Sequence, residues 1–305
     1  MGTLYEAARQ RIKKLFLEIY PEEKITGHDL NNLYQLIEDN IRDVACSLNK
    51  WDQTDTVLIT YGGSIVNGKE PPLQTLHKFL RQHLKDEIRC VHILPFYPYS
   101  SDDGFSVIDY YQVNPDLGSW QDIGAIHKDF DLMMDLVINH VSSQSQWFRN
   151  YLEGHSPGTG YFIEMDPQTD LSGVTRPRST PLLTPVKTSR GEKHVWTTFS
   201  ADQVDLDFSN PRVLYEMLRV LFYYIRQGAR IIRLDAIAYL WKERGTSCIH
   251  LPQTHHIVKL IRELAELIHP DTIILTETNV PDRENLSYFG DKGDEAHMIY
   301  QFPLP

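Results

Sequence analysis

The sequence predicts an α/β protein built from repeated strand–helix units around a parallel sheet. Short apolar runs alternate with amphipathic helical patterns along most of the chain, an order typical of βα units. The runs are rich in Ile, Leu and Val rather than alternating with polar residues, as expected for strands that are buried on both faces. We therefore expect a (β/α)8 barrel of the TIM type that is truncated after about six strands.

Two helices are predicted before the first strand. Their apolar faces are formed by Tyr5, Ala8, Ile12, Leu15 and Ile19, and by Leu33, Ile37, Ile41 and Val44. These residues recur at the three- and four-residue spacing of one helix face. We interpret residues 1–50 as a helical N-terminal extension.

Six apolar runs are candidate strands. They are TVLITY (56–61), CVHILPF (90–96), DLMMDLVINH (131–140), ARIIRLDA (229–236), TIILTET (272–278) and HMIYQF (297–302). Helical patterns separate several of them, at 73–84 and 254–269 and before the fourth strand. In that last helix Asn210 suits the N-cap, Pro211 the first helical position and Gly228 the stop.

Residues 141–210 form an irregular stretch rich in Ser, Thr, Pro and Gly. It is too long for a simple loop in a compact domain, so we expect an inserted small subdomain after the third strand. The catalytic barrel then comprises 51–140 and 211–305. Without the insertion, each unit has ~30 residues, and a complete barrel has eight strands in roughly 250 residues. An open, doubly wound sheet of six strands is the alternative.

Composition excludes several classes of protein. The net charge of −11 argues against nucleic acid as a partner, and no apolar run approaches the ~18 residues of a membrane span. Cys46, Cys90 and Cys248 are far apart in the sequence, which favours a reducing cytoplasm over a disulfide framework or a zinc site. The sequence does not determine the oligomeric state.

Polar residues recur where the predicted strands end. They are Thr60 and Tyr61, then Asp135, Asn139 and His140, then Arg233 and Asp235, and finally Glu277. One such residue is usually a cap or a loop residue, but the carboxyl ends of parallel barrel strands hold the active site. Four polar strand ends together therefore predict a site at this face.

Asp235 and Glu277 follow two strands that we expect to be neighbours, about 4.8 Å apart. This spacing suits the carboxylate pair of retaining glycoside chemistry, which needs about 5–5.5 Å. Arg233, two residues before Asp235 on the same face, is expected to keep that carboxylate ionised. The alternative is a structural Arg–Asp pair inside a barrel, which leaves Glu277 unexplained.

Several segments resemble one known family. DLVINH (135–140), IIRLDAIAY (231–239) and ILTETNVP (274–281) are similar, in order and spacing, to three of the four signature regions of glycoside hydrolase family 13, the α-amylase superfamily. The segments 92–122, VTRPRSTPLLTP (174–185) and FSADQVDLDFSNP (199–211) resemble its sucrose-phosphorylase branch. Within that branch DPQTDLSGVTRPR (166–178), KERGTSCIHLPQTH (242–255) and SYFGDKGDEAHMIYQF (287–302) are most similar to the glucosylglycerate phosphorylases.

The resemblance implies roles for the residues at the donor side of the site. Asp235 would be the nucleophile that forms a β-glucosyl-enzyme, Glu277 the general acid/base, and Arg233 a support for the nucleophile. The glucose hydroxyls and ring would be bound by Asp102, Phe105 and His140.

It also implies roles at the acceptor side. Arg176 and Arg178 are candidate anchors for phosphate or for an anionic acceptor such as glycerate, and Gln203 belongs to the same acceptor-side loop. Asn279 stands where sucrose phosphorylases carry His, which argues against sucrose. Asn139 matches a calcium ligand of many amylases, but this branch generally lacks that ion. We therefore expect no metal and no cofactor, with inorganic phosphate as co-substrate.

The implied function is that of a retaining α-glucosyl phosphorylase, which converts 2-O-α-glucosyl-glycerate and phosphate to α-glucose 1-phosphate and glycerate. Its partners would be a small-molecule glucoside and phosphate. Three alternatives stay open: a sucrose or sucrose 6′-phosphate phosphorylase, a hydrolase of the α-glucosidase or amylase type, and an inactive fragment or sugar-binding remnant.

One carboxylate of the family's site has no counterpart in this sequence. It is an Asp that follows a His on a later strand, and Asp282, Asp291 and Asp294 do not follow a His. We expect it to lie beyond Pro305, so that the chain corresponds to the N-terminal portion of a phosphorylase. Open sheet edges favour aggregation, and the chain by itself is therefore expected to be poorly soluble and inactive.

Overall fold

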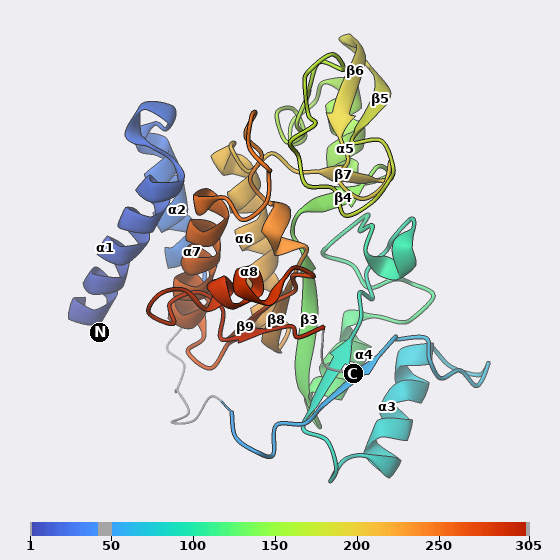
Figure 1. The fold of residues 1–305 in the computed structure, drawn as a ribbon. Coiled ribbons are helices and arrows are strands. Elements are labelled where there is room, and N and C mark those ends of the chain that lie inside the picture. Colours follow the sequence, from blue (N-terminus) through green and yellow to red (C-terminus); the bar gives the residue numbers. More distant parts are fainter. Residues whose placement is uncertain (1, 42–50, 303–305) are drawn as a thin grey trace.

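The centre of the molecule is a sheet of six parallel strands (Figure 1). The structure is a computed structural model that describes residues 2–41 and 51–302. The strands are β1 (Val57–Thr60), β2 (Cys90–Ile93), β3 (Asp131–Val137), β8 (Ala229–Asp235), β9 (Ile273–Thr276) and β10 (Met298–Ile299). They neighbour one another in this order and form a curled half-barrel, which confirms the expected six-stranded parallel sheet.

The two faces of the sheet have different neighbours because successive side chains of a strand point in opposite directions. Met134 and Ile232 point outward into the main hydrophobic core. Met133 and Ile231 point inward, where they form a smaller apolar cluster with Cys90 and Ile273. The polar residues Asp135 and Arg233 follow on this inner face, in register with each other across β3 and β8.

Helices pack against the outer face of the sheet. They include α3 (Pro72–His83), α4 (Trp120–His127), α6 (Pro211–Arg226) and α7 (Pro252–Ile268). The start of α6 is the predicted one, because the Asn210 side chain accepts a hydrogen bond from the backbone N–H of Arg212 and Pro211 occupies the first helical position. The local rules for helix ends therefore hold here.

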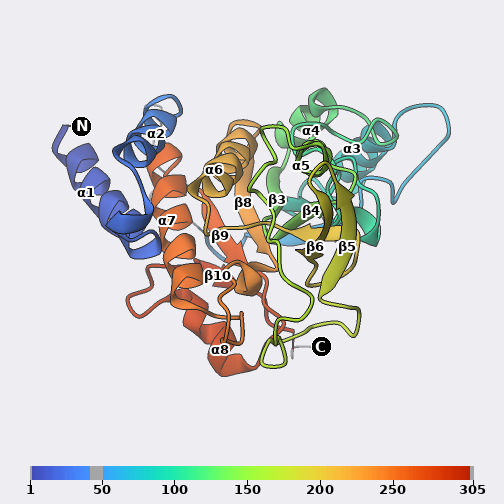
Figure 2. The same cartoon turned by 90° about the horizontal axis from the view of Figure 1, so that it is seen from above.

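The N-terminal helix α1 (Gly2–Ile19) lies beside α7 (Figure 2). Ile12 and Phe16 are fully buried in the main core, and the Arg11 guanidinium is 2.5 Å from the Glu263 carboxylate on α7. This helix therefore completes the hydrophobic core instead of standing apart from it.

The second helix α2 (Gly27–Glu38) is shorter than predicted. It ends before Ile41, whose side chain still packs against the main core. Val44, which is predicted on the same helix face, and Cys46 lie outside the described residues.

Residues 140–205 form a small unit above the carboxyl ends of the central strands (Figure 1). It contains the antiparallel pairs β4 (His140–Ser142) with β7 (Gln203–Asp205) and β5 (Leu183–Thr188) with β6 (Gly191–Trp196), together with α5 (Gln146–Glu153). The stretch that we read as irregular thus has its own short strands. In the described part of the chain no helix has both the length and the apolar character to cross a membrane.

The packing of α1 can be tested with Phe16→Ala. Removing a fully buried ring should lower the free energy of unfolding by about 3–5 kcal/mol, because a cavity remains where the ring was. The control is Phe79→Ala on α3, whose ring is 40% exposed and whose loss should cost less than about 1 kcal/mol. Urea denaturation measures both values. Equal, small losses would show that α1 does not belong to the core.

Candidate active site

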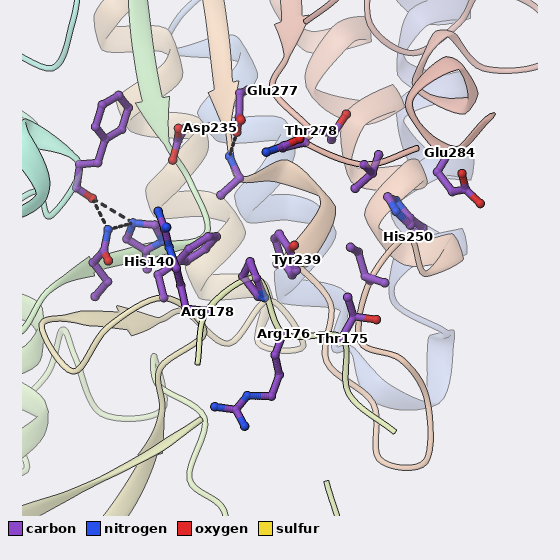
Figure 3. Close-up of a pocket in the computed structure, with 18 of the residues that line it drawn as sticks. His140, Thr175, Arg176, Arg178, Asp235, Tyr239, His250, Glu277, Thr278 and Glu284 are labelled. Carbon is purple, nitrogen blue, oxygen red and sulfur yellow. Dashed lines mark hydrogen bonds between the residues drawn. The ribbon is translucent and has the colours of Figure 1, made fainter. Parts of the chain in front are cut away.

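A cavity of about 730 Å³ opens at the carboxyl ends of the central strands (Figure 3). All ten residues that the sequence nominated line it: Asp102, Phe105, His140, Arg176, Arg178, Gln203, Arg233, Asp235, Glu277 and Asn279. They come from four strand ends and from the inserted residues. The first and the last of them, Asp102 and Asn279, are 177 residues apart in the sequence. The fold therefore brings together side chains that are distant in sequence.

Arg233 lies between two carboxylates in the floor of the cavity. Its Nη1 is 2.5 Å from Asp135 Oδ1 and 2.9 Å from Asp235 Oδ1. The pairing with Asp135 follows from strand register, because these residues face each other across β3 and β8. The guanidinium also lies 5.5 Å from the centre of the Phe105 ring and 5.1 Å from that of Tyr300, both favourable cation–π distances.

The chain of buried polar side chains continues to His92 on β2. Its Nε2 lies 2.7 Å from Asp135 Oδ2, and both side chains are fully buried. Asp135 is thus held from two sides, by an imidazole and by a guanidinium. Since rotation of any member would leave a buried polar group unpaired, the chain His92–Asp135–Arg233 fixes the position at which Asp235 meets Arg233.

Burial raises the pKa of Asp235 to about 7, against the opposing effect of Arg233 and with contributions from the carboxylates of Glu277 and Asp135. Arg233 acts in the expected direction, since it lowers the pKa of Asp235, but burial outweighs its effect. The physical reason is that one guanidinium is shared by two carboxylates, and that Asp235 is removed from water.

Glu277 follows β9 and is held by the loop after the neighbouring strand. The backbone N–H of Ala236 donates to Glu277 Oε2 at 3.2 Å. The backbone N–H of Glu277 donates to the Leu234 carbonyl at 3.0 Å. Ala236 has φ +53°, a left-handed conformation that costs an L residue free energy and often marks a functional site. This turn directs the amide that follows Asp235 at Glu277.

A second group of polar side chains lies on the other side of Asp235. The Gln203 Nε2 donates to Asp102 Oδ2 at 2.9 Å, and His140 Nε2 lies 2.9 Å from the carbonyl oxygen of Phe105. Burial lowers the pKa of His140, and Lys242 acts in the same direction, against Asp205 and the Phe105 carbonyl. A neutral His140 carries its proton on Nε2, where the Phe105 carbonyl oxygen accepts it, and it brings no second cation into the floor.

The arginine-containing loop forms the outer wall. The Arg176 guanidinium donates to the carbonyl oxygen of Thr180 in its own loop, whereas Arg178 is exposed and has no hydrogen-bond or ion-pair partner among the residues that the structure describes. The N–H of Thr175 donates to the Ser247 carbonyl at 2.9 Å, which ties this loop to the segment after β8.

A buried ammonium occupies the position next to Asn139. Lys242 Nζ lies 2.8 Å from Asn139 Oδ1 and 2.6 Å from Asp205 Oδ2, and its side chain is only 3% exposed. The backbone N–H and the hydroxyl of Thr198 also donate to the Asp205 carboxylate. These oxygens are already occupied by a cation of the chain, so the residues do not fit a calcium ion here.

Sequence reasoning missed several residues of the cavity. They are Thr175, Pro177, Phe199, Ala236, Tyr239, Ile249, His250, Thr278, Val280, Pro281 and Glu284. Tyr239 and Thr278 stand inside quoted motifs and could have been found there. Phe199 and His250 also stand inside quoted motifs, but no periodic pattern around them marks them as site residues. Asp282, Asp291 and Asp294 are exposed and do not line the cavity.

A family model described as the catalytic domain of α-amylase matches residues 82–305. The chain is 52% identical over 303 residues to the glucosylglycerate phosphorylase of Spirochaeta thermophila, covering 97% of this chain and 51% of that protein. It is 48% identical over 299 residues to the glucosylglycerate phosphorylase of Escherichia coli, covering 97% and 53%. The chain thus spans about half the length of the curated relatives that it matches.

Among solved structures, the sucrose 6F-phosphate phosphorylase from Thermoanaerobacter thermosaccharolyticum superposes with a TM-score of 0.74 at 28% sequence identity. The match covers 84% of this chain and 53% of that one. The fold is therefore shared with a phosphorylase of known structure.

The raised pKa of Asp235 predicts a pH-dependent loss of stability. The folded chain keeps this proton up to about pH 7, whereas the unfolded chain releases it near pH 4, so wild-type stability should fall between about pH 4 and 7. Asp235→Asn removes this loss and should be more stable at pH 8, by up to about 4 kcal/mol. The difference should vanish below about pH 4.

Urea denaturation of both chains between pH 3.5 and 8 measures this difference. Glu38→Gln, which changes an exposed carboxylate on α2, is the matched control and should follow the wild-type curve. A variant Asp235→Asn that is less stable than wild type at pH 8 would show that Arg233 outweighs burial.

The buried ammonium predicts independence from calcium. Lys242→Met should lower the free energy of unfolding by about 3–5 kcal/mol, because Asp205 stays buried without its cation. Lys187→Met on the exposed side of β5 is the control and should change little. Adding calcium or a chelator should leave the melting temperature of the unmodified chain unchanged, and a clear rise with calcium would refute this assignment.

Proposed function

Because the chain belongs to the family of the α-amylase catalytic domain, we propose that it carries the nucleophile and the general acid/base of a retaining α-glucosyl phosphorylase. The substrate that we propose is a 2-O-α-glucosyl derivative of glycerate, and the second substrate is inorganic phosphate. Support comes from relatives at 48–54% identity that are named glucosylglycerate phosphorylases.

The observation that carries the proposal is the arrangement of two carboxylates from adjacent strands around one cavity. Asp235 ends β8 with its carboxylate fixed by Arg233, and Glu277 follows β9 with its carboxylate fixed by the N–H of Ala236. Two carboxylates held by different partners can take two different roles, one as nucleophile and one as proton carrier.

The reaction runs in two displacements. The Asp235 carboxylate attacks the anomeric carbon, the bond from that carbon to the glycerate oxygen breaks, and Glu277 gives its proton to the leaving oxygen. A phosphate oxygen then attacks the same carbon, Asp235 leaves, and Glu277 takes back a proton from the phosphate. Two inversions give α-glucose 1-phosphate, the anomer of the starting glucoside.

Positioning of the glucosyl group falls to the polar group formed by Asp102, Gln203 and His140. The carboxylate of Asp102 accepts from Gln203 and can accept from sugar hydroxyls, while neutral His140 donates to the Phe105 carbonyl and so fixes the backbone at Phe105. The aromatic ring of Phe105 lies beside them and offers an apolar face for the sugar ring.

The outer wall supplies an anchor for phosphate. Arg178 lacks a partner among the described residues, and its guanidinium can bind a phosphate oxygen pair in bidentate geometry. We propose that Arg178 and Arg176 favour phosphate over water as the second nucleophile. The preference for phosphate over water is what distinguishes the proposed phosphorylase from a hydrolase with the same two carboxylates.

We also propose that the reaction needs no metal and no cofactor, which the ammonium of Lys242 beside Asn139 and Asp205 supports. The location that we propose is the cytoplasm, and two free, buried cysteines, Cys90 and Cys248, support it. The division into N-terminal helices, barrel and inserted subdomain remains our interpretation of the chain's domains.

The proposal is tested by trapping the glucosyl-enzyme. The full chain is incubated at high concentration with 5-fluoro-α-glucosyl fluoride, a donor whose leaving group needs no proton, and peptides are analysed by mass spectrometry. A glucosyl adduct is expected on Asp235 and should be absent from Asp235→Asn. Phosphate should accelerate its release, and the acceleration should be lost in Arg178→Ala.

Arg190→Ala, on the surface of the inserted residues and outside the cavity, is the matched control for the arginine. An adduct on another residue, or one that persists in Asp235→Asn, would refute the nucleophile assignment. Release by water and phosphate at equal rates would favour a hydrolase.

A further inference from the structure

We propose that His250 determines which acceptor the site takes, by donating a hydrogen bond from Nε2 to the carboxylate of a small hydroxy acid at the outer end of the cavity. This inference rests on the proposed function and deepens it, because it names the residue that distinguishes an anionic acceptor from a neutral one. Figure 3 shows His250 at the end of the cavity away from His140.

His250 connects the two loops that follow the catalytic carboxylates, one through its backbone and the other through its imidazole. Its backbone N–H donates to the carbonyl of Ala238, three residues after Asp235, at 3.1 Å. Its Nδ1 lies 2.9 Å from the hydroxyl of Tyr288 in the loop after Glu277. The ring is therefore held relative to both carboxylates and not only by its own loop.

The partner Tyr288 is itself immobilised. It is fully buried, and its ring stacks on that of His255 with 4.6 Å between centres. His255 in turn lies 2.7 Å from the carboxylate of Glu295. A packed and hydrogen-bonded support of this kind restricts the position of a site residue.

The hydrogen bond decides which nitrogen of His250 carries the proton. Burial raises the pKa of Tyr288, so its hydroxyl keeps a proton that must be donated. His250 Nδ1 is the acceptor that the structure shows for it within the described residues, and leaving that buried proton unpaired would cost free energy. Nδ1 is thus the acceptor, and neutral His250 carries its proton on Nε2.

The Nε2–H group is then a donor without an acceptor in the described part of the chain. It is not among the fully buried unpaired atoms, as expected for a nitrogen that opens into the cavity. Burial and the neighbouring His255 lower the pKa of His250, against Glu284, so the neutral form dominates at neutral pH.

The surroundings of His250 select an anionic ligand with hydroxyl groups. Arg176 and Arg178 line the same cavity, and their loop is tied to the His250 segment by the hydrogen bond from Thr175 to Ser247. Glu284 lines the cavity too and supplies an acceptor for a ligand hydroxyl. Donors and one acceptor together suit a hydroxy acid better than a neutral polyol.

Backbone conformation indicates that the position is constrained. His250 and Cys248 both have positive φ, +56° and +53°, in a segment without glycine at these positions. Such conformations cost about 1–3 kcal/mol each and persist where the surroundings impose them. Here the cost is compatible with a loop that must present one side chain to the cavity.

The test uses two ligands that differ at one group, 2-O-α-glucosylglycerate and neutral 2-O-α-glucosylglycerol. Binding to the full chain is measured by calorimetry without phosphate. The unmodified chain should prefer the acid, and His250→Asn should weaken binding of the acid about tenfold, as expected for one hydrogen bond to a charged acceptor. Binding of the neutral ligand should not change.

His83→Asn, an exposed histidine on α3, is the matched control. Nuclear magnetic resonance of the ¹⁵N-labelled imidazoles, assigned with His250→Asn, should show the Nε2–H form of His250 and a shift of this signal with the acid alone. Tyr288→Phe removes the hydroxyl that His250 Nδ1 accepts from, so both neutral forms of His250 should then be populated. The residues that line the cavity stay the same, because Tyr288 is not one of them.

An Nδ1–H form in the unmodified chain, no binding of the acid, or unchanged affinity for the acid in His250→Asn would each overturn the inference. The outcome is separate from that of the proposed function. If the adduct on Asp235 is absent while His250 still selects the acid, the proposed chemistry fails and the inference stands. If the adduct forms and the selection is absent, only the inference fails.

Discussion

The guanidinium of Arg233 lies between Asp135 and Asp235 inside the curled sheet, and the geometry of the site depends on this contact. A buried cation needs its partners, because an uncompensated charge in this environment costs several kcal/mol. Asp135 therefore cannot move away without leaving His92 without its partner and Arg233 with one carboxylate instead of two. The carboxylate of Asp235 is in turn fixed where β8 ends, beside Glu277 on the next strand.

The same constraint explains why the nucleophile candidate is not a simple ionised side chain. Arg233 compensates two carboxylates at once, and burial works against a second negative charge. The backbone contributes a further constraint at the loops. Asp102, Ala236 and His250 line the cavity with left-handed backbone conformations. Side chains on rigid strands form the floor, and strained loops place the donors and acceptors that surround it.

Much of the fold could be predicted because the signals are local. Runs of Ile, Leu and Val marked the six strands, and Asn210 with Pro211 marked the start of α6. The extent of elements was less predictable. α2 ends at Glu38 and β10 comprises only Met298–Ile299, since packing and pairing with neighbours decide where an element stops. The hairpin of β5 and β6 was missed because its strands lack strong apolar alternation.

The sequence by itself determined which chemical groups the site contains, since Asp235, Glu277 and Arg233 are recognisable from their order at the ends of apolar strands. Tertiary structure decided how these groups behave. The register of β3 and β8 places Asp135 opposite Arg233. The path of the chain brings Lys242 next to Asn139, and it brings Tyr288 next to His250. A pKa, a tautomer or an occupied cation position depends on burial and on neighbours from distant segments, and no local pattern of residues encodes those distances.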